Sequence, residues 1–205
     1  MKRALFTGAL AVVAAAALLV SVNPTQSTAA EAATYVGSDA CKACHFKQHR
    51  YWKKTGMAKA MDSLKPTTEA DDKELFDRKK ASNVDPAKDY TTDASCLACH
   101  TTGYGKTGGY PTDAAANAEA AGKQDHVGCE ACHGAGSEYI KFKEAKLAAD
   151  DKAKFTFDEL APSGLAKPDE ANCKTCHNDK NPTNASDDFK FKVEKDLVHS
   201  KKKKK

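Results

Sequence analysis

The fold is decided by a five-residue pattern that first occurs as Cys41-Lys-Ala-Cys44-His45. It returns as Cys96-Leu-Ala-Cys99-His100, Cys129-Glu-Ala-Cys132-His133 and Cys173-Lys-Thr-Cys176-His177, and the four copies use all eight cysteines of the chain. Two cysteines at this spacing, followed directly by histidine, are typical of covalent haem c attachment. The thiols bond to the haem, and the histidine becomes an axial ligand of its iron. We therefore predict four covalent haem c groups, whose proximal iron ligands are His45, His100, His133 and His177.

Three other uses of paired cysteines explain the pattern less well. Zinc sites use the same cysteine spacing but do not require a histidine after each second cysteine. Disulfides are common in exported proteins and do not require that histidine either. A thioredoxin-like redox pair occurs once, in a setting of alternating strands and helices. Four complete copies with no cysteine left over favour haem.

The remaining composition is unusual for a globular chain without a cofactor. Charged residues make up 29% of the sequence, and Leu, Ile and Val are scarce after the N-terminal segment. Such a chain buries too little apolar surface to offset the conformational entropy that it loses on folding. We expect four haems, each large, flat and apolar, to supply the core.

The N-terminal residues have the features of a secretory signal peptide. Lys2 and Arg3 precede an almost unbroken apolar run over residues 4–22, and Ala30-Glu31-Ala32 matches a cleavage site. A membrane anchor is the alternative, because the run approaches the length that spans a bilayer. The alanine-rich run and the cleavage-like end favour export. We predict a signal peptide at 1–32 and a periplasmic or exported protein with no membrane span after cleavage.

The mature chain is predicted to be one compact tetrahaem cytochrome domain at 33–200, followed by a basic lysine tail at 201–205. Sequence patterns predict helices at 46–64, 68–81, 113–123, 137–149 and 189–199. Loops join these helices, and no convincing strand pattern occurs. The predicted fold class is therefore mainly α with extensive loops, with the haems forming the core.

The charge distribution identifies no macromolecular partner. The tail carries five positive charges, more than the net charge of +4 for the whole chain, so the remainder is acidic. The tail is either a solvated end or a contact for an acidic partner, and nothing else indicates nucleic-acid binding. The glycine-rich stretch at 103–109 lacks the spacing of a phosphate-binding loop. It is predicted to let the backbone pass close to a haem.

Longer runs around the motifs carry a family resemblance. They are Trp52-Lys-Lys-Thr-Gly-Met-Ala-Lys-Ala-Met-Asp-Ser-Leu-Lys-Pro66, Asp85 to Thr92, Gly103 to Tyr110 and Val127-Gly-Cys-Glu-Ala-Cys-His-Gly134. With these runs the mature chain resembles the tetrahaem cytochrome c-554 family of ammonia-oxidising bacteria. The resemblance implies a mostly helical fold with closely packed haems and an electron donor like hydroxylamine oxidoreductase. It also implies that the second haem, at His100, is five-coordinate and looks able to handle nitric oxide.

The iron face opposite each proximal histidine needs a distal ligand, and three histidines remain: His49, His126 and His199. His49 follows the first motif and is predicted either to bind a neighbouring haem or to face solvent. The resemblance implies that His199 is a C-terminal distal ligand. His126 matches a distal position of related multihaem proteins. Since three histidines serve four irons, at least one haem lacks a distal histidine from this chain.

Two distal histidines of the family are replaced in this sequence. One falls on Lys143, and the other falls on Met57, which the resemblance assigns to the third haem, at His133. Core packing is the alternative for a helical methionine. A histidine–methionine pair raises the reduction potential relative to a pair of histidines. Met57 would therefore make one haem the high-potential member.

The predicted function is electron transfer between redox partner proteins rather than catalysis, because no constellation of catalytic carboxylates or nucleophiles occurs. One alternative is reduction of nitric oxide or nitrite at an open-sided haem on His100. The other is a subunit of an extracellular cytochrome filament, in which a neighbouring subunit donates a distal ligand.

Overall fold

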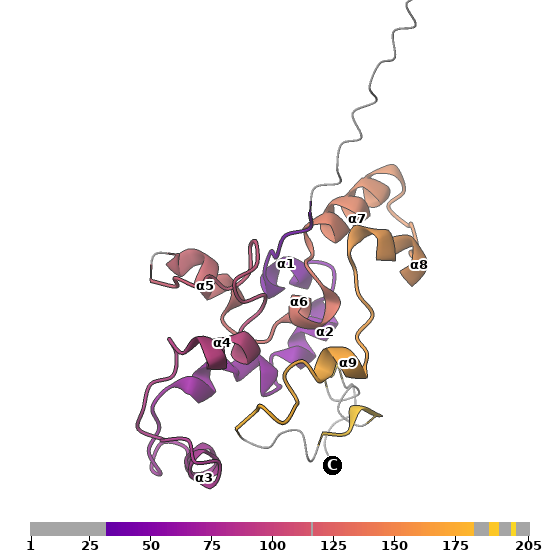
Figure 1. Cartoon of the computed structure of the whole chain (residues 1–205). Helices are drawn as coiled ribbons and strands as arrows, with labels where there is room; N and C mark the ends of the chain where they lie inside the picture. Colours follow the sequence, from indigo (N-terminus) through magenta and orange to yellow (C-terminus); the bar gives the residue numbers. More distant parts are fainter. Residues whose placement is uncertain (1–31, 116, 183–188, 193–197, 200–205) are drawn as a thin grey trace, which may run out of the picture. The chain divides into compact units, whose positions relative to one another are not determined.

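Short helices joined by loops make up the part of the chain that the computed structural model describes, residues 32–115, 117–182, 189–192 and 198–199 (Figure 1). Its α-helices are α1 (Ser38–Lys42), α2 (Phe46–Trp52), α3 (Lys73–Ala81), α4 (Ala94–His100), α5 (Ala118–Gln124), α6 (Cys129–His133), α7 (Ser137–Ala149), α8 (Phe157–Leu160) and α9 (Glu170–Cys173). Its 3-10 helices are η1 (Met57–Lys59), η2 (Met61–Leu64) and η3 (Ala161–Ser163). No β-strand occurs among the described residues. The predicted mainly α fold is confirmed.

The chain divides into a unit of residues Met1–Glu31 and a unit that starts at Ala32. The predicted signal peptide, apart from Ala32, and the predicted lysine tail lie outside the described residues. Within the described ranges, no helix is both long enough and apolar enough to cross a membrane.

The predicted single helix at 46–64 is wrong beyond Trp52, where α2 ends. The hydroxyl of Thr55 donates to the carbonyl oxygen of Trp52 at 2.7 Å, and Gly56 follows. A hydroxyl that bonds the nearby backbone, together with a glycine, offers the chain an alternative to the α-helix. The remainder continues as η1 and η2, and Met61 and Leu64 of η2 are buried.

Side-chain caps and local turns set the bounds of the other helices. α3 starts after Asp72, whose carboxylate accepts from the backbone N–H of Leu75, and not at residue 68 as predicted. α5 starts after Asn117 rather than at residue 113. α7 has the predicted bounds. Residues 193–197 of the predicted helix at 189–199 lie outside the described residues, so this helix stays a prediction.

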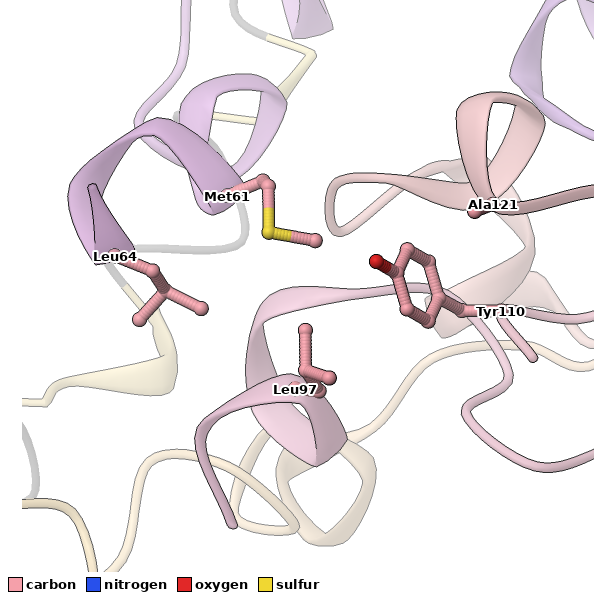
Figure 2. Close-up of a cluster of buried hydrophobic side chains, with 5 residues drawn as sticks. All are labelled: Met61, Leu64, Leu97, Tyr110 and Ala121. Carbon is pink, nitrogen blue, oxygen red and sulfur yellow. The ribbon is translucent and has the colours of Figure 1, made fainter. Parts of the chain in front are cut away.

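The apolar core of the polypeptide is small. One cluster contains two residues of η2, one of α4, one of the following loop and one of α5: Met61, Leu64, Leu97, Tyr110 and Ala121 (Figure 2). Trp52 is the only other buried apolar side chain among the described residues. A domain of this length normally buries most of the surface that its unfolded chain exposes. The small cluster agrees with the expectation that the core needs a further component.

One buried carboxylate joins segments that are distant in the sequence. Glu130 of α6 is only 3% exposed. Its oxygens accept hydrogen bonds from three backbone N–H groups, those of Val36 at 2.9 Å, Gly37 at 2.7 Å and Gly136 at 2.7 Å. Val36 and Gly37 lie just before α1, and Gly136 is the residue before α7. Glu130 therefore fixes the starts of α1 and α7 against α6.

The glycine-rich stretch at 103–109 makes room for the N-terminal segment. Gly103 has a φ of 64° and Gly108 a φ of 75°, a region that favours glycine. A Cβ atom on Gly103 would lie 2.8 Å from the ring of Tyr35. The backbone N–H of Tyr35 donates to the carbonyl oxygen of Thr107 at 3.1 Å. These contacts explain the glycines, and the approach of this loop to a haem stays a prediction.

Candidate haem-binding centre

Each attachment motif lies on one short helical turn. The first cysteine of each motif belongs to α1, α4, α6 or α9. In the first and fourth motifs the backbone N–H of the histidine donates to the carbonyl oxygen of the first cysteine, at 2.9 Å for His45 and 3.0 Å for His177. Residues three and four apart on such a turn share a face. The two thiols and the histidine of a motif are thus presented together, and none of the eight cysteines forms a disulfide bond.

The first and third motifs meet at their first cysteines. The thiol of Cys41 and the sulfur of Cys129 are hydrogen-bonded, and this bond lowers the pKa of Cys129 to about 7. The same contact, with burial, raises the pKa of Cys41. Helices α1 and α6 also lie next to each other. The first and third attachment sites are therefore neighbours.

The fourth motif lies between the second motif and the third. Burial and then the neighbouring Cys176 raise the pKa of Cys99, in the second motif, to about 11. Burial, followed by Cys173 and Cys176, raises the pKa of Cys132, in the third motif, to about 11. These contacts arrange the four motifs in the order first, third, fourth and second.

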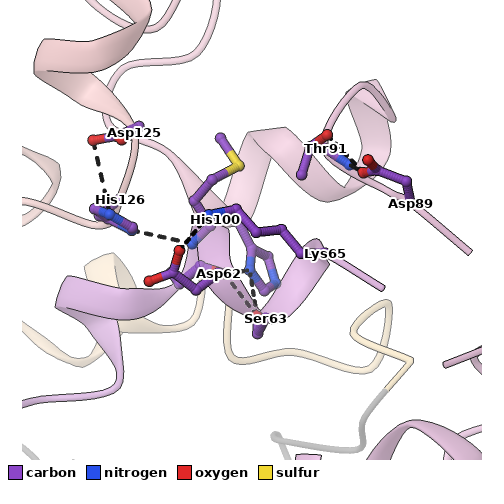
Figure 3. A network of polar contacts seen from close by, with 10 residues as sticks. Asp62, Ser63, Lys65, Asp89, Thr91, His100, Asp125 and His126 are labelled. Atoms are coloured by element: carbon purple, nitrogen blue, oxygen red, sulfur yellow. Dashed lines mark hydrogen bonds and ion pairs between the residues drawn. The ribbon is translucent and has the colours of Figure 1, made fainter. Parts of the chain in front are cut away.

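Two of the four predicted proximal histidines are oriented by backbone carbonyl groups. The Nδ1 atom of His100 lies 2.7 Å from the carbonyl oxygen of Ala60 (Figure 3). The Nδ1 atom of His133 lies 3.2 Å from the carbonyl oxygen of Ala166. Because a carbonyl oxygen only accepts, Nδ1 carries the proton in both rings, which leaves the lone pair of Nε2 free for a metal. Burial lowers the pKa of His100 and so favours the neutral ring.

His45 has a different neighbour. Its Nε2 atom lies 2.8 Å from the hydroxyl oxygen of Tyr139, on α7. Burial, and then the charge of Lys143, lower the pKa of His45. Tyr139 is absent from the site residues predicted above, because a tyrosine in a helix is usually a packing residue. The two residues are 94 positions apart, so no local pattern connects them.

His199 lies beside His133. Their ring centroids are 6.2 Å apart and their planes differ by only 5°. Two imidazoles bound to opposite sides of one metal ion through bonds of about 2.0–2.1 Å would have centroids roughly 6 Å apart. Burial, and then His133, lower the pKa of His199. The pair has the spacing of two axial ligands, although the family resemblance assigned this position to Met57.

His126 is held in the opposite way to His100. Its Nδ1 atom accepts a hydrogen bond from the backbone N–H of Met61 at 3.2 Å (Figure 3). An accepting Nδ1 is unprotonated, so the neutral ring carries its proton on Nε2. Nε2 lies 3.8 Å from a carboxylate oxygen of Asp125. In this arrangement neither nitrogen offers a free lone pair, and iron binding by His126 stays a prediction.

His49 and Met57 take different positions. The His49 side chain is 5% exposed, and its Nε2 atom is buried without a hydrogen-bond partner among the described residues. A carboxylate oxygen of Asp39 lies 3.4 Å from that nitrogen. Met57 is half-buried in η1, and its carbonyl oxygen accepts from the backbone N–H of Val127. The Asp39 carboxylate is thus the partner of this buried nitrogen in the described part of the chain, and iron binding by His49 stays a prediction. The hydrogen bond between Met57 and Val127 comes from the Met57 backbone, so it does not test whether the Met57 sulfur binds iron.

His177 is the fourth predicted proximal histidine. Its half-buried ring stacks on Phe189, with centroids 4.6 Å apart and an angle of 24° between the planes. Covalently bound haem fits three features of the motifs. Their eight cysteines lie on four helical turns, two of their histidine rings have the Nε2 lone pair available, and one of these two rings is parallel to a second imidazole at axial spacing.

Comparisons with known proteins agree with this geometry. A family model described as "Cytochrome c554 and c-prime" matches residues 40–134. Cytochrome c-554 of Nitrosomonas europaea is 36% identical over 164 residues, which cover 79% of this chain and 65% of that protein. The structure of reduced cytochrome c554 from Nitrosomonas europaea has 31% sequence identity and a TM-score of 0.61. The match covers 78% of this chain and 80% of that one.

Proposed function

Because the chain belongs to the cytochrome c-554 family, we propose that it is an exported carrier that passes single electrons between redox partner proteins. Its cofactor is haem c, four groups per chain, bound covalently. When bound, haem c supplies an iron that takes up and releases one electron. The eight motif cysteines hold the four groups, and His45, His100, His133 and His177 are the proximal ligands.

The observation that carries the proposal is the row of motifs. Cys41 touches Cys129, Cys132 lies near Cys173 and Cys176, and Cys176 touches Cys99. Four one-electron centres held side by side suit transfer from one end of the row to the other. The ends are the first motif, with His45, and the second motif, with His100.

Among the distal candidates, we assign His199 to the haem of His133, because the two rings lie at axial spacing. His49, Met57 and His126 stay predictions. The electron donor is proposed to resemble hydroxylamine oxidoreductase, on the resemblance alone.

The test uses the purified four-haem protein and two matched double variants. Cys173→Ala/Cys176→Ala removes the central fourth attachment, and Cys96→Ala/Cys99→Ala removes the terminal second one. After mixing with a one-electron donor, we expect wild type to take up four electrons and deliver them to an acceptor cytochrome. The first variant should equilibrate electrons slowly among its three remaining haems, whereas the second should equilibrate them as fast as wild type.

Equal rates in both variants would remove the support for transport along the row. Rapid turnover of nitric oxide or nitrite by the reduced protein would instead favour the reductase alternative. The proposed export is checked separately by N-terminal sequencing of the protein isolated from its native host, which should begin at Ala33. A sequence that begins at Met1 would contradict cleavage.

A further inference from the structure

The first motif has a tyrosine on the iron-binding side of its histidine. The hydroxyl oxygen of Tyr139 lies 2.8 Å from Nε2 of His45, the nitrogen that a haem iron would take. The two rings are 6.2 Å apart at their centroids and inclined by 27°. We propose that Tyr139 is the distal oxygen ligand of the haem attached at Cys41 and Cys44. The proposal rests on the haem binding proposed above.

The position of Tyr139 is built into the fold. Gly136, the residue before α7, donates its N–H to the buried carboxylate of Glu130. The backbone N–H of Thr34 donates to the hydroxyl of Ser137 at 2.9 Å, and the N–H of Ser137 donates back to the carbonyl oxygen of Thr34 at 3.2 Å. These bonds fix the start of α7 two residues before Tyr139. A ligand held by such outer contacts is oriented before the metal binds.

The same carboxylate orients the histidine. Glu130 also accepts from the backbone N–H groups of Val36 and Gly37, and Gly37 is the N-cap of α1. The first motif begins on α1, and the N–H of His45 bonds back to Cys41 at 2.9 Å. One buried side chain thus positions both His45 and Tyr139. The contact between His45 and Tyr139 therefore depends on how α1 and α7 are held by Glu130.

The separation of the two atoms and the charge of a nearby lysine suit a metal-bound phenolic oxygen. Bonds of about 2 Å from one iron to each partner would place the oxygen and the nitrogen about 4 Å apart. The two atoms, which are 2.8 Å apart, therefore have to separate by roughly 1 Å more when iron binds between them. The phenol proton leaves to solvent when the oxygen binds. Lys143, one turn along α7, has its Nζ atom 5.8 Å from the Tyr139 ring centroid, and its charge offsets that of the oxygen.

Tyrosine is an established axial ligand of haem iron, and an anionic oxygen favours the ferric state. The haem on His45 is therefore the low-potential end of the row, opposite in character to one with two imidazoles. Electrons leave that end readily and reach it only from a strong reductant. Electron transfer along the row of motifs is therefore favoured away from the first motif.

The experiment compares the ferric four-haem protein with Tyr139→Phe, and with Tyr90→Phe as the matched control. The hydroxyl of Tyr90 accepts from the backbone N–H of Asp85 rather than bonding a histidine. In wild type, resonance Raman spectra should show tyrosine ring modes enhanced by a phenolate-to-iron transition. Tyr139→Phe should lose these modes, raise one of four reduction potentials and bind one more equivalent of cyanide. Tyr90→Phe should match wild type.

Two further variants keep the test decisive. Tyr139→His places an imidazole at the same site, and should add one low-spin ferric haem in the EPR spectrum even if Tyr139→Phe does not fold. Lys143→Met should retain the tyrosine modes. Unchanged spectra and cyanide stoichiometry in Tyr139→Phe would overturn the proposal, as would opening of the haem in Lys143→Met. A haem count of four by the pyridine haemochrome method shows that such a failure concerns the ligand and not haem binding.

Discussion

Helices α6 and α9 carry the third and fourth attachment motifs, and the chain holds these two short helices by opposite means. In α6 the carboxylate of Glu130 is buried and binds three backbone N–H groups from other segments. In α9 the exposed carboxylate of Asp169 accepts from Asn172 of its own helix at 2.8 Å. No residue of α9 is buried. A carboxylate thus links distant segments of the chain at α6, whereas at α9 it caps only its own helix.

The difference shows how burial changes the contribution of a carboxylate to the stability of the fold. Removal of Glu130 would leave three backbone donors without this acceptor, and those of Gly37 and Gly136 are buried. An unsatisfied buried donor lowers the stability of the fold. Removal of the exposed cap lets water bond the freed N–H of Asn172. The direct bond between the two helices is weak, from the Asn172 amide to the Ala131 carbonyl oxygen at 3.5 Å. We expect α9 to loosen without disturbing α6.

The largest expected effect is that of Glu130→Ala. It should lower the free energy of unfolding of the four-haem protein by on the order of 3–5 kcal/mol, because a buried charged acceptor and its bonds are lost. Denaturant unfolding followed by haem absorbance measures the change. Glu138→Ala, on the next helix with a partly exposed ion pair to Lys141, is the control and should cost less than about 1 kcal/mol. Equal losses of stability in Glu130→Ala and Glu138→Ala would show that burial does not raise the contribution of the carboxylate.

The next effect is that of Trp52→Phe. The indole N–H donates to the carbonyl oxygen of Val127 at 2.9 Å, which ties α2 to the loop before α6. Its loss leaves the carbonyl oxygen of the half-buried Val127 without this donor and should cost about 1–3 kcal/mol. Phe46→Leu, on the same helix with a 55% exposed side chain, should change stability by less than about 0.5 kcal/mol. The same denaturant titration measures both variants.

Asp169→Ala should have a smaller and local effect. Loss of an N-cap carboxylate costs about 1 kcal/mol, and here only α9 depends on it. Amide hydrogen exchange should accelerate in α9 and remain unchanged in α6, and Asp169→Asn should restore the wild-type rate. Faster exchange in both helices would mean that α9 supports α6.

The smallest effect concerns pH at α4, which carries the second motif. Hydrogen bonds from the Ser95 hydroxyl and backbone N–H lower the pKa of Asp93. A carboxyl whose pKa is lower in the folded chain adds stability above its unfolded pKa and loses it as pH falls through the folded value. Asp93→Asn should therefore melt slightly below wild type at pH 7, with the difference vanishing in acid. A difference that persists at pH 2 would show that the charge is irrelevant.

Several features of the fold were predictable because they depend on neighbours in sequence. The attachment motifs, the bounds of α7 and the absence of strands in the described residues follow from short patterns. The break after Trp52 was missed, because a hydroxyl bond from Thr55 competes with a helix that the apolar pattern favours. Glu130 was read only as part of its motif, since its partners lie up to 94 residues away.

The distal faces of the irons show where sequence reasoning stops. The sequence supplied seven histidines, and the resemblance added Met57 as a candidate ligand. The contacts of Tyr139 with His45 and of His199 with His133 were not accessible in this way. Each contact joins residues on different elements. No local sequence pattern around Tyr139 or His199 indicates which residue it contacts.

The sequence by itself determined which residues can hold four haems, because attachment requires two thiols and a histidine on a single turn of chain. The tertiary structure alone decided what faces those histidines and in which order the motifs lie. Order and distal contacts depend on where separate helices are packed, and here one buried carboxylate on α6 sets the positions of α1 and α7.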